Sequence, residues 1–321
     1  MARTRPPIAR LSLAGRTVLI TGAAGGIGSA TSRVLHGRGA NVVVSDPRLD
    51  AAEALAAELG GSRVLPVTVD VTSRSTLDVA VEAAIEVFGG LDVVFANAGI
   101  AVDPPATVAG VDERDFERVI DVDLLGVWRT VRACLPQLIA RRGHVLMTAS
   151  IYAYFNGVLN APYAMSKAGV EQLSRALRVE LAAYGATAGV LYPGWVDTPI
   201  ARAAFDPSAP TSGLVERAFP APLRKPTTPH AVAVAAVRGI ERRSARVTIP
   251  RRWTPFSLLR GIVNPLTDVK LEADPEVRRV VLEIERGRHS ANATRESGDE
   301  RDRTSHLDST SGAPRDPRGS A

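Results

Sequence analysis

The chain contains little sulfur and few aromatic rings. Of its 321 residues, one is cysteine, three are methionine and 5% are aromatic. The lone Cys134 excludes an intrachain disulfide framework and is typical of a protein in a reducing compartment. The five histidines are scattered without ligand spacing, so we expect no metal site.

Long apolar runs are lacking as well. None reaches the roughly 18 residues that a membrane-spanning helix needs. The segment from Met1 to Arg16 holds four arginines but lacks the continuous apolar core of a signal peptide. We therefore expect a cytoplasmic protein.

The composition is otherwise that of a globular enzyme, with 45% hydrophobic and 23% charged residues. The net charge is +5, and the basic excess gathers between Arg217 and Arg252, which hold nine lysines and arginines. This segment is either a solvated arginine-rich surface or a contact for an anionic substrate, an acidic partner or a membrane. No aromatic pattern or recognition motif accompanies the charge, so we expect no nucleic acid partner.

Between Thr17 and Ile249, short β-branched runs alternate with longer alanine-rich amphipathic stretches. Near-continuous apolar runs such as VLIT and NVVV suit a parallel sheet covered on both faces. The expected strands are Thr17–Thr21, Asn41–Ser45, Arg63–Val69, Leu91–Ala96, His144–Thr148, Ala186–Leu191 and Arg246–Ile249. Expected helices include Ser29–Gly37, Ala51–Leu59 and Ser75–Phe88. The pattern predicts an α/β chain with a doubly wound, seven-stranded parallel sheet.

The first expected strand runs into a glycine-rich turn, TGAAGGIG, from Thr21 to Gly28. Gly22, Gly26 and Gly28 allow a tight turn and close approach of the backbone to a pyrophosphate. The N-terminus of the following helix offers free N–H groups and a positive dipole end. Such a pattern is weak evidence alone, but its place between a strand and a helix indicates a dinucleotide site.

Asp46 follows the second strand, 18 residues after Gly28. A carboxylate there accepts hydrogen bonds from a ribose 2′-hydroxyl and repels a 2′-phosphate, which favours NAD over NADP. The nearby Arg48 would soften this preference. The alternative is that Asp46 is only a turn or cap residue before Pro47.

Further candidates follow the third and fourth strands. Asp70 and Val71 are placed to meet the adenine, and the small residues of Asn97-Ala98-Gly99 suit close approach of the backbone to a cofactor. All lie at the carboxyl ends of strands, where open α/β sheets bind ligands.

A candidate catalytic group follows the fifth strand. Ser150 ends that strand, Tyr163 comes 13 residues later, and Lys167 lies four residues beyond it. Tyr163 and Lys167 share one face of a helix. An ammonium beside a phenol favours the phenolate, and a serine hydroxyl can stabilise charge that develops on a substrate oxygen.

Together these motifs resemble the short-chain dehydrogenase/reductase (SDR) family over roughly Leu11 to Pro250. The resemblance rests on Thr21–Gly28, Asn97–Gly99, Ser150, Tyr163, Lys167 and Pro193-Gly194. It implies a Rossmann fold and an oxidoreductase that interconverts a CH–OH group and a carbonyl with NAD or NADP. It also implies that Tyr163 is the general acid/base, that Lys167 lowers its pKa and binds the nicotinamide ribose, and that Ser150 positions the substrate oxygen.

The expected site is therefore large. Thr198, in PGWVDT, would contact the nicotinamide carboxamide. The expected cofactor contacts are Thr21, Gly22, Gly26, Ile27, Gly28, Asp46, Asp70, Val71, Asn97, Ala98, Gly99, Tyr163, Lys167, Pro193, Gly194, Val196 and Thr198. The expected catalytic residues are Ser150, Tyr163, Lys167 and Asp123.

Asp123 is a departure from the family, which usually places an asparagine there. Aspartate keeps the hydrogen-bond acceptor but loses the amide donor, and its negative charge would raise the pKa of Tyr163. We expect reduced or retuned activity.

The C-terminal part departs as well. After a dinucleotide-binding domain of residues 1–250, an apolar extension of residues 251–285 replaces the family's V-D-G-G segment. Its start, Arg251–Leu266, is expected to cap the substrate cleft or, as a lesser alternative, to lie on a membrane surface. From residue 286 onward, large apolar residues are almost absent, which predicts a disordered tail.

The substrate is expected to be hydrophobic, such as a steroid- or retinoid-like alcohol or ketone. Pocket candidates are Ile151, Tyr152, Tyr154, Trp195 and a lid over Ala203–Pro229. We expect a homodimer or other homo-oligomer. The alternative function is a dinucleotide-binding regulatory or scaffold protein on the same fold, with little turnover.

Overall fold

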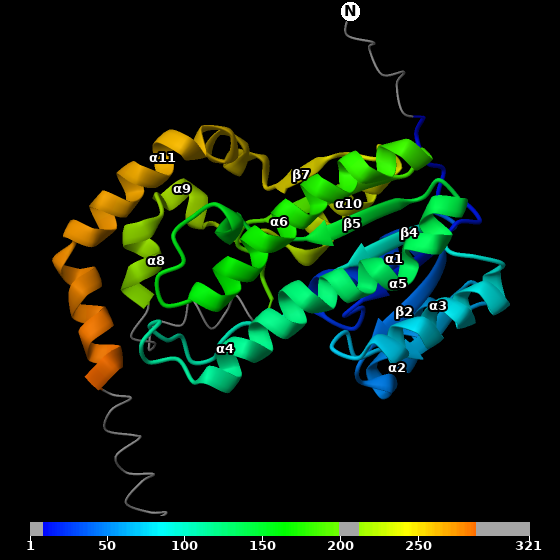
Figure 1. Ribbon diagram of the computed structural model, residues 1–321, viewed down its shortest axis with the longest axis horizontal. Helices are drawn as coiled ribbons and strands as arrows, with labels where there is room; N and C mark the ends of the chain where they lie inside the picture. The colour runs from blue at the N-terminus through cyan, green and yellow to red at the C-terminus, as the bar shows by residue number, and fades with distance from the viewer. Residues whose placement is uncertain (1–8, 199–211, 287–321) are drawn as a thin grey trace, which may run out of the picture.

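The computed structural model describes residues 9–198 and 212–286, and these contain a seven-stranded parallel sheet (Figure 1). The strands lie in the order β3-β2-β1-β4-β5-β6-β7. Their bounds are β1 Thr17–Thr21, β2 Asn41–Asp46, β3 Val64–Thr68, β4 Val93–Ala96, β5 His144–Thr148, β6 Thr187–Pro193 and β7 Arg246–Ile249. The predicted doubly wound α/β fold is confirmed, and strand order reverses between β1 and β4, where such sheets bind ligands.

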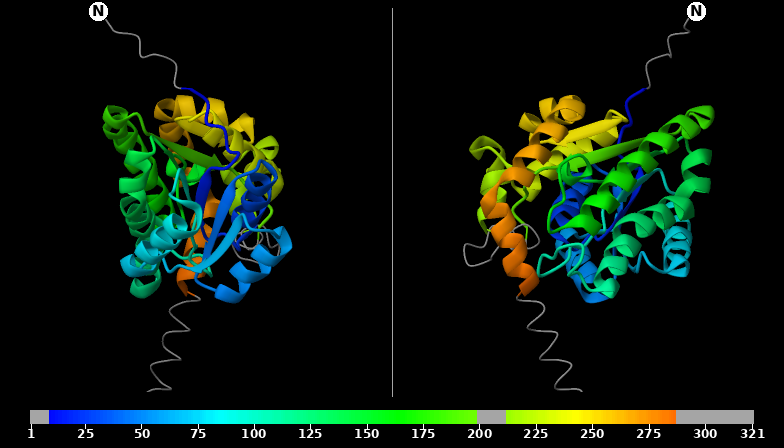
Figure 2. Two further views of the ribbon diagram at one scale, coloured as in Figure 1. Left: turned by 90° about the vertical axis from the view of Figure 1, so that its right-hand side faces the viewer. Right: turned by 60° about the vertical axis from the view of Figure 1, so that its left-hand side comes forward.

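Helices cover both faces of the sheet (Figure 2). Their bounds are α1 Gly26–Gly37, α2 Leu49–Leu59, α3 Arg74–Phe88, α4 Glu113–Ile120, α5 Gly126–Ala140, α6 Ala161–Leu181, α8 Ser212–Ala218, α9 Ala221–Arg224, α10 Pro229–Glu241 and α11 Thr254–Ala273. A further helix spans residues 275–286. The helix α1 begins three residues before the expected start, because the last glycines of the turn already have helical geometry.

The strand residues explain the two layers. Successive side chains of a strand point to opposite faces, and all of β1 is buried. Leu19 joins the hydrophobic cluster under α3, α5 and α6, whereas Val18 and Ile20 join the cluster under α1 and α10. A strand that is buried on both faces must be apolar throughout, as the sequence pattern predicted.

The residues after β7 pack against the body of the molecule. Trp253 is fully buried in an aromatic cluster with Phe155, Phe219 and Phe256, with ring centroids between 5.4 and 6.2 Å from its own. The predicted tail from residue 287 and the first part of the predicted lid, residues 199–211, lie outside the described residues.

Two absences apply to residues 9–198 and 212–286. No helix there is both long enough and apolar enough to cross a membrane. The same residues contain no group of histidine, cysteine or acidic side chains that could hold a metal ion.

Candidate active site

Two cavities open at the carboxyl edge of the sheet. The first has a volume of about 1160 Å³ and is lined by the glycine-rich turn, the ends of β2, β3 and β4, and one side of α4. The second, of about 540 Å³, lies beyond β5 and β6. Five residues line both cavities, and they are Ile27, Ile100, Thr148, Tyr163 and Thr198.

The glycine-rich turn is packed too tightly for side chains. Gly22 has a φ of +62°, and a Cβ there would lie 2.9 Å from the Ala98 Cα. A Cβ on Gly28 would lie 2.2 Å from the Gly22 carbonyl oxygen. With α1 beginning at Gly26, the unbonded N–H groups of its first turn lie beside the first cavity, which suits the diphosphate of a dinucleotide.

Asp46 is buried at the end of β2 and lines the first cavity. Its carboxylate accepts hydrogen bonds from the backbone N–H of Ala24 at 3.1 Å and of Arg48 at 3.3 Å. The Arg48 Nε lies 3.6 Å from the carboxylate, on a side chain that is 68% exposed. Asp46 therefore holds the glycine-rich turn in place and also presents an acidic group to the cavity.

Thr21 has a different position from the one expected. It does not line the cavity, and its hydroxyl accepts hydrogen bonds from the backbone N–H of Asn97 at 3.0 Å and of Ala98 at 3.2 Å. Asn97 is held on its other side by the Thr148 hydroxyl, which donates to its side-chain oxygen at 3.3 Å. These contacts join the ends of β1, β4 and β5.

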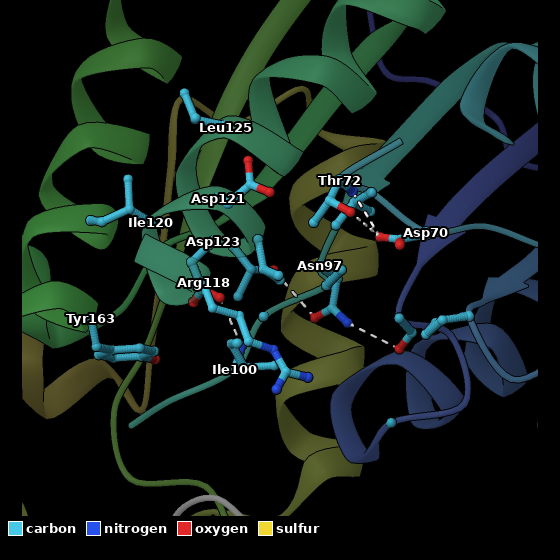
Figure 3. Close-up of a pocket in the computed structure, with 18 of the residues that line it drawn as sticks. Asp70, Thr72, Asn97, Ile100, Arg118, Ile120, Asp121, Asp123, Leu125 and Tyr163 are labelled. Atoms are coloured by element: carbon cyan, nitrogen blue, oxygen red, sulfur yellow. Dashed lines mark hydrogen bonds between the residues drawn. The ribbon is translucent and has the colours of Figure 1, made fainter. Parts of the chain in front are cut away.

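Asp70 and Val71 line the first cavity beside Thr72 (Figure 3). The Thr72 hydroxyl and backbone N–H both donate to one oxygen of the Asp70 carboxylate. Asn97, Ala98 and Gly99 line the same cavity. These five predicted residues are therefore brought together.

The three predicted catalytic side chains also meet. Tyr163 points into the cavity from α6 (Figure 3), and the Lys167 Nζ lies 5.2 Å from the centre of its ring. Ser150 hydrogen-bonds to Tyr163 and lines the second cavity only. Burial raises the pKa of Tyr163 above its ordinary value. The Lys167 ammonium and the Ser150 hydrogen bond oppose that rise in pKa.

Asp123 is fully buried in a π-helical turn, Asp121–Leu125, between α4 and α5. Its carboxylate accepts from the Ile100 backbone N–H at 2.7 Å and lies 2.8 Å from the Lys167 Nζ. The pKa of Lys167 is lowered by burial but raised more strongly by Asp123 and Tyr163, so it lies above its ordinary value. Asp123 also raises the pKa of Tyr163, which is the direction that its charge predicted.

The second cavity has an aromatic wall. Tyr152 lies edge-on to Tyr163 at 5.9 Å and to Trp195 at 6.1 Å, and Trp195 lies edge-on to Phe219 at 5.7 Å. Polar lining residues include Asp103, Asn156 and Asn160. The cavity can therefore surround an apolar molecule while the Ser150 and Tyr163 hydroxyls meet one oxygen.

Some expectations need correction. Tyr154 does not line either cavity, because the turn at Ile151–Ala153 reverses the chain and Tyr154 is buried against Tyr192 instead. Pro193, Gly194 and Val196 line the second cavity and not the first. Gly28 braces the turn without lining either one.

Other lining residues were not predicted. Arg118 extends from α4 into the first cavity near Ile100 and Asp123 (Figure 3), and Arg114, one turn earlier, also lines it. Two arginines four residues apart on one helix are a signal that could have found this wall. Leu214 and Val215 of α8 carry no motif that the sequence could reveal.

Comparison with known proteins identifies the chain. The family model for short chain dehydrogenases matches residues 16–208. The chain belongs to the short-chain dehydrogenase/reductase family. As an SDR it is an NAD(P)-dependent oxidoreductase that acts on CH–OH groups, and the predicted enzyme class is confirmed. The first cavity, with its glycine-rich turn and acidic strand end, fits the dinucleotide that the family uses.

Individual SDR relatives agree with this assignment. Oxidoreductase UcpA from Salmonella typhimurium is 36% identical over 228 residues, which is 68% of this chain and 84% of that protein. Cis-4-hydroxycyclohexanecarboxylate dehydrogenase from Sinomonas cyclohexanicum is 38% identical over 191 residues, 59% of this chain and 76% of that one. An SDR from Burkholderia phymatum, solved in complex with NAD, shares the fold with a TM-score of 0.69 at 24% identity, covering 83% of this chain and 98% of that chain.

Proposed function

We propose that this SDR interconverts a hydrophobic secondary alcohol and the corresponding ketone, with NAD as the preferred dinucleotide. The observation that carries the proposal is the position of Tyr163 at the junction of the two cavities. A reacting carbon in the second cavity then lies beside both the phenol and the dinucleotide in the first.

The chain's own residues divide the chemistry between them. The bound nicotinamide supplies the hydride acceptor for oxidation and the hydride donor for reduction. In the direction of oxidation, the Tyr163 Oη takes the proton of the substrate hydroxyl, while Ser150 holds the substrate oxygen. The Lys167 ammonium stabilises the phenolate that accepts the proton.

The preference for NAD rests on Asp46. Its carboxylate lies in the wall of the first cavity, where it accepts from a ribose 2′-hydroxyl and repels a 2′-phosphate. The Arg48 side chain is mostly exposed and 3.6 Å away, so it reduces this repulsion only in part.

The preference for a hydrophobic substrate rests on the second cavity. Its aromatic wall of Tyr152, Trp195 and Phe219 offers apolar surface, and its volume suits a ligand larger than a simple alcohol. A steroid- or retinoid-like alcohol fits this description. The relative that oxidises a hydroxycyclohexane carboxylate supports a ring-bearing alcohol.

The test is turnover of NAD(H) and NADP(H) against a panel of steroids, retinoids, long-chain alcohols and sugars. The wild type is expected to turn over an apolar alcohol best and with NAD. Tyr163→Phe should lose about 10²–10⁴-fold in rate, the usual contribution of general acid–base catalysis, while still binding NAD. Tyr184→Phe, an exposed tyrosine at the end of α6, is the matched control and should keep wild-type turnover.

Two results would contradict the proposal. One is wild-type turnover in Tyr163→Phe, which would remove the phenol from the chemistry. The other is a sugar as the best substrate, which would contradict the interpretation of the second cavity.

A further inference from the structure

The helix α11 has an apolar stripe on its outer side. Five large side chains in this stripe are between 54 and 69% exposed. They are Leu258, Leu259, Ile262, Leu266 and Val269. Their spacing places them on one face of the helix, opposite the face that packs inward through Phe256 and Val263. The helix runs along the outer margin of the molecule (Figure 1), and the family match ends before it, at residue 208.

An exposed contiguous patch of this kind marks a contact surface. The opposite face of α11 is already tied to the body, because the Arg260 guanidinium pairs with the buried Glu171 carboxylate at 2.8 Å. The stripe is therefore held facing outward and cannot turn inward without breaking that buried ion pair.

The charges at the two ends of α11 indicate which partner covers the stripe. Arg251 lies just before the N-terminus, and Glu272 lies in the last turn. Both charges oppose the helix dipole, so neither gains from its own helix. Among the described residues, neither side chain has an ion-pair partner.

Two other charges near the C-terminal end are already used within the chain. Lys270 donates to the Arg217 carbonyl oxygen at 3.0 Å, and Asp268 accepts from the Asn156 side chain at 2.9 Å. Glu272 is therefore the acidic group at this end that remains available to a partner.

We propose that the stripe binds a second copy of this chain, with the two α11 helices packed antiparallel about a two-fold axis. Antiparallel packing places stripe on stripe and brings Arg251 of one copy towards the Glu272 end of the other. The helix dipoles then also run in opposite directions. A two-fold interface uses the same patch on both copies, which a self-complementary stripe with opposite charged ends provides.

A membrane surface is a poorer match for the same stripe. Helices that lie on anionic lipid carry lysine and arginine along the border of the apolar face. Here Asp268 and Glu272 lie beside the stripe and would face the lipid headgroups.

The first test is the mass of the full chain in solution, measured by sedimentation equilibrium. Ile262→Asp places a charge at the middle of the stripe and should halve the mass relative to wild type at equal concentration. Val79→Asp is the matched control, since Val79 is 57% exposed on α3, and its mass should equal that of wild type. Circular dichroism melting establishes that each variant is folded.

The second test addresses the charged ends. Arg251→Glu and Glu272→Arg should each weaken association, and the double variant should recover it, because the two charges are exchanged across the interface. A monomeric wild type, or equal masses for wild type and Ile262→Asp, would overturn the proposal. So would binding to phosphatidylserine vesicles that Ile262→Asp abolishes without any change in mass.

Discussion

The two cavities differ in what they are made of. The first is built largely from backbone at strand ends, with glycines, Asn97 and Asp46 fixed by hydrogen bonds to neighbouring strands. The second is built from large side chains that come from a turn, a strand end and α8. The backbone-built cavity suits a ligand that is always the same, whereas a cavity of side chains can change its ligand by substitution.

The largest expected effect that would sharpen this comparison comes from Gly28→Ala. A Cβ there meets the Gly22 carbonyl, and overpacking of this kind costs about 1–3 kcal/mol. We expect a lower melting temperature and weaker NAD binding, measured by calorimetry. Gly37→Ala, where a Cβ meets nothing within 4 Å, is the control. Unchanged NAD affinity in Gly28→Ala would show that the turn tolerates side chains.

The next effect concerns the pair at the junction of the cavities. In Asp123→Asn the carboxylate that raises the pKa of Tyr163 is removed, so that pKa falls. The acid limb of the pH–rate profile for oxidation should then move to lower pH, and the rate at neutral pH should rise. Asp121→Asn is the control, since that exposed carboxylate pairs with Arg129. A profile that does not move would contradict the electrostatic role of Asp123.

The smallest effect is expected in the second cavity. Val215→Ala enlarges the α8 wall, and the loss of one or two methyl contacts is worth about 1–3 kcal/mol of substrate discrimination. KM for the apolar substrate should rise, while the affinity for NAD should stay the same. A parallel loss of NAD affinity would mean that the two cavities do not act as separate units.

The sequence predicted the first cavity better than the second. The expected bounds of β1, β5 and β7 agree with the structure, because the apolar runs end sharply at turn residues. Asp46, Asp70 and Asn97 line the first cavity because the carboxyl ends of parallel strands meet at one edge. Motif and position therefore coincide wherever the backbone makes the site.

Elsewhere the sequence could not give the contacts. Tyr154 was expected in a pocket, but a reversal of the chain that no pattern reveals buries it in the core. The ion pair of Asp123 with Lys167 depends on a π-helical turn, which has no signature in the residues themselves. Phe219 reaches the second cavity only through tertiary packing against Trp253.

The contact of Trp253 with Gly194 has an evolutionary consequence. A Cβ on Gly194 would lie 2.3 Å from the indole nitrogen, so the extension after β7 is moulded onto a loop that lines the second cavity. Descendants of one ancestral enzyme can therefore acquire new substrates by exchanging the segment beyond Pro250, while the residues that hold the dinucleotide stay untouched.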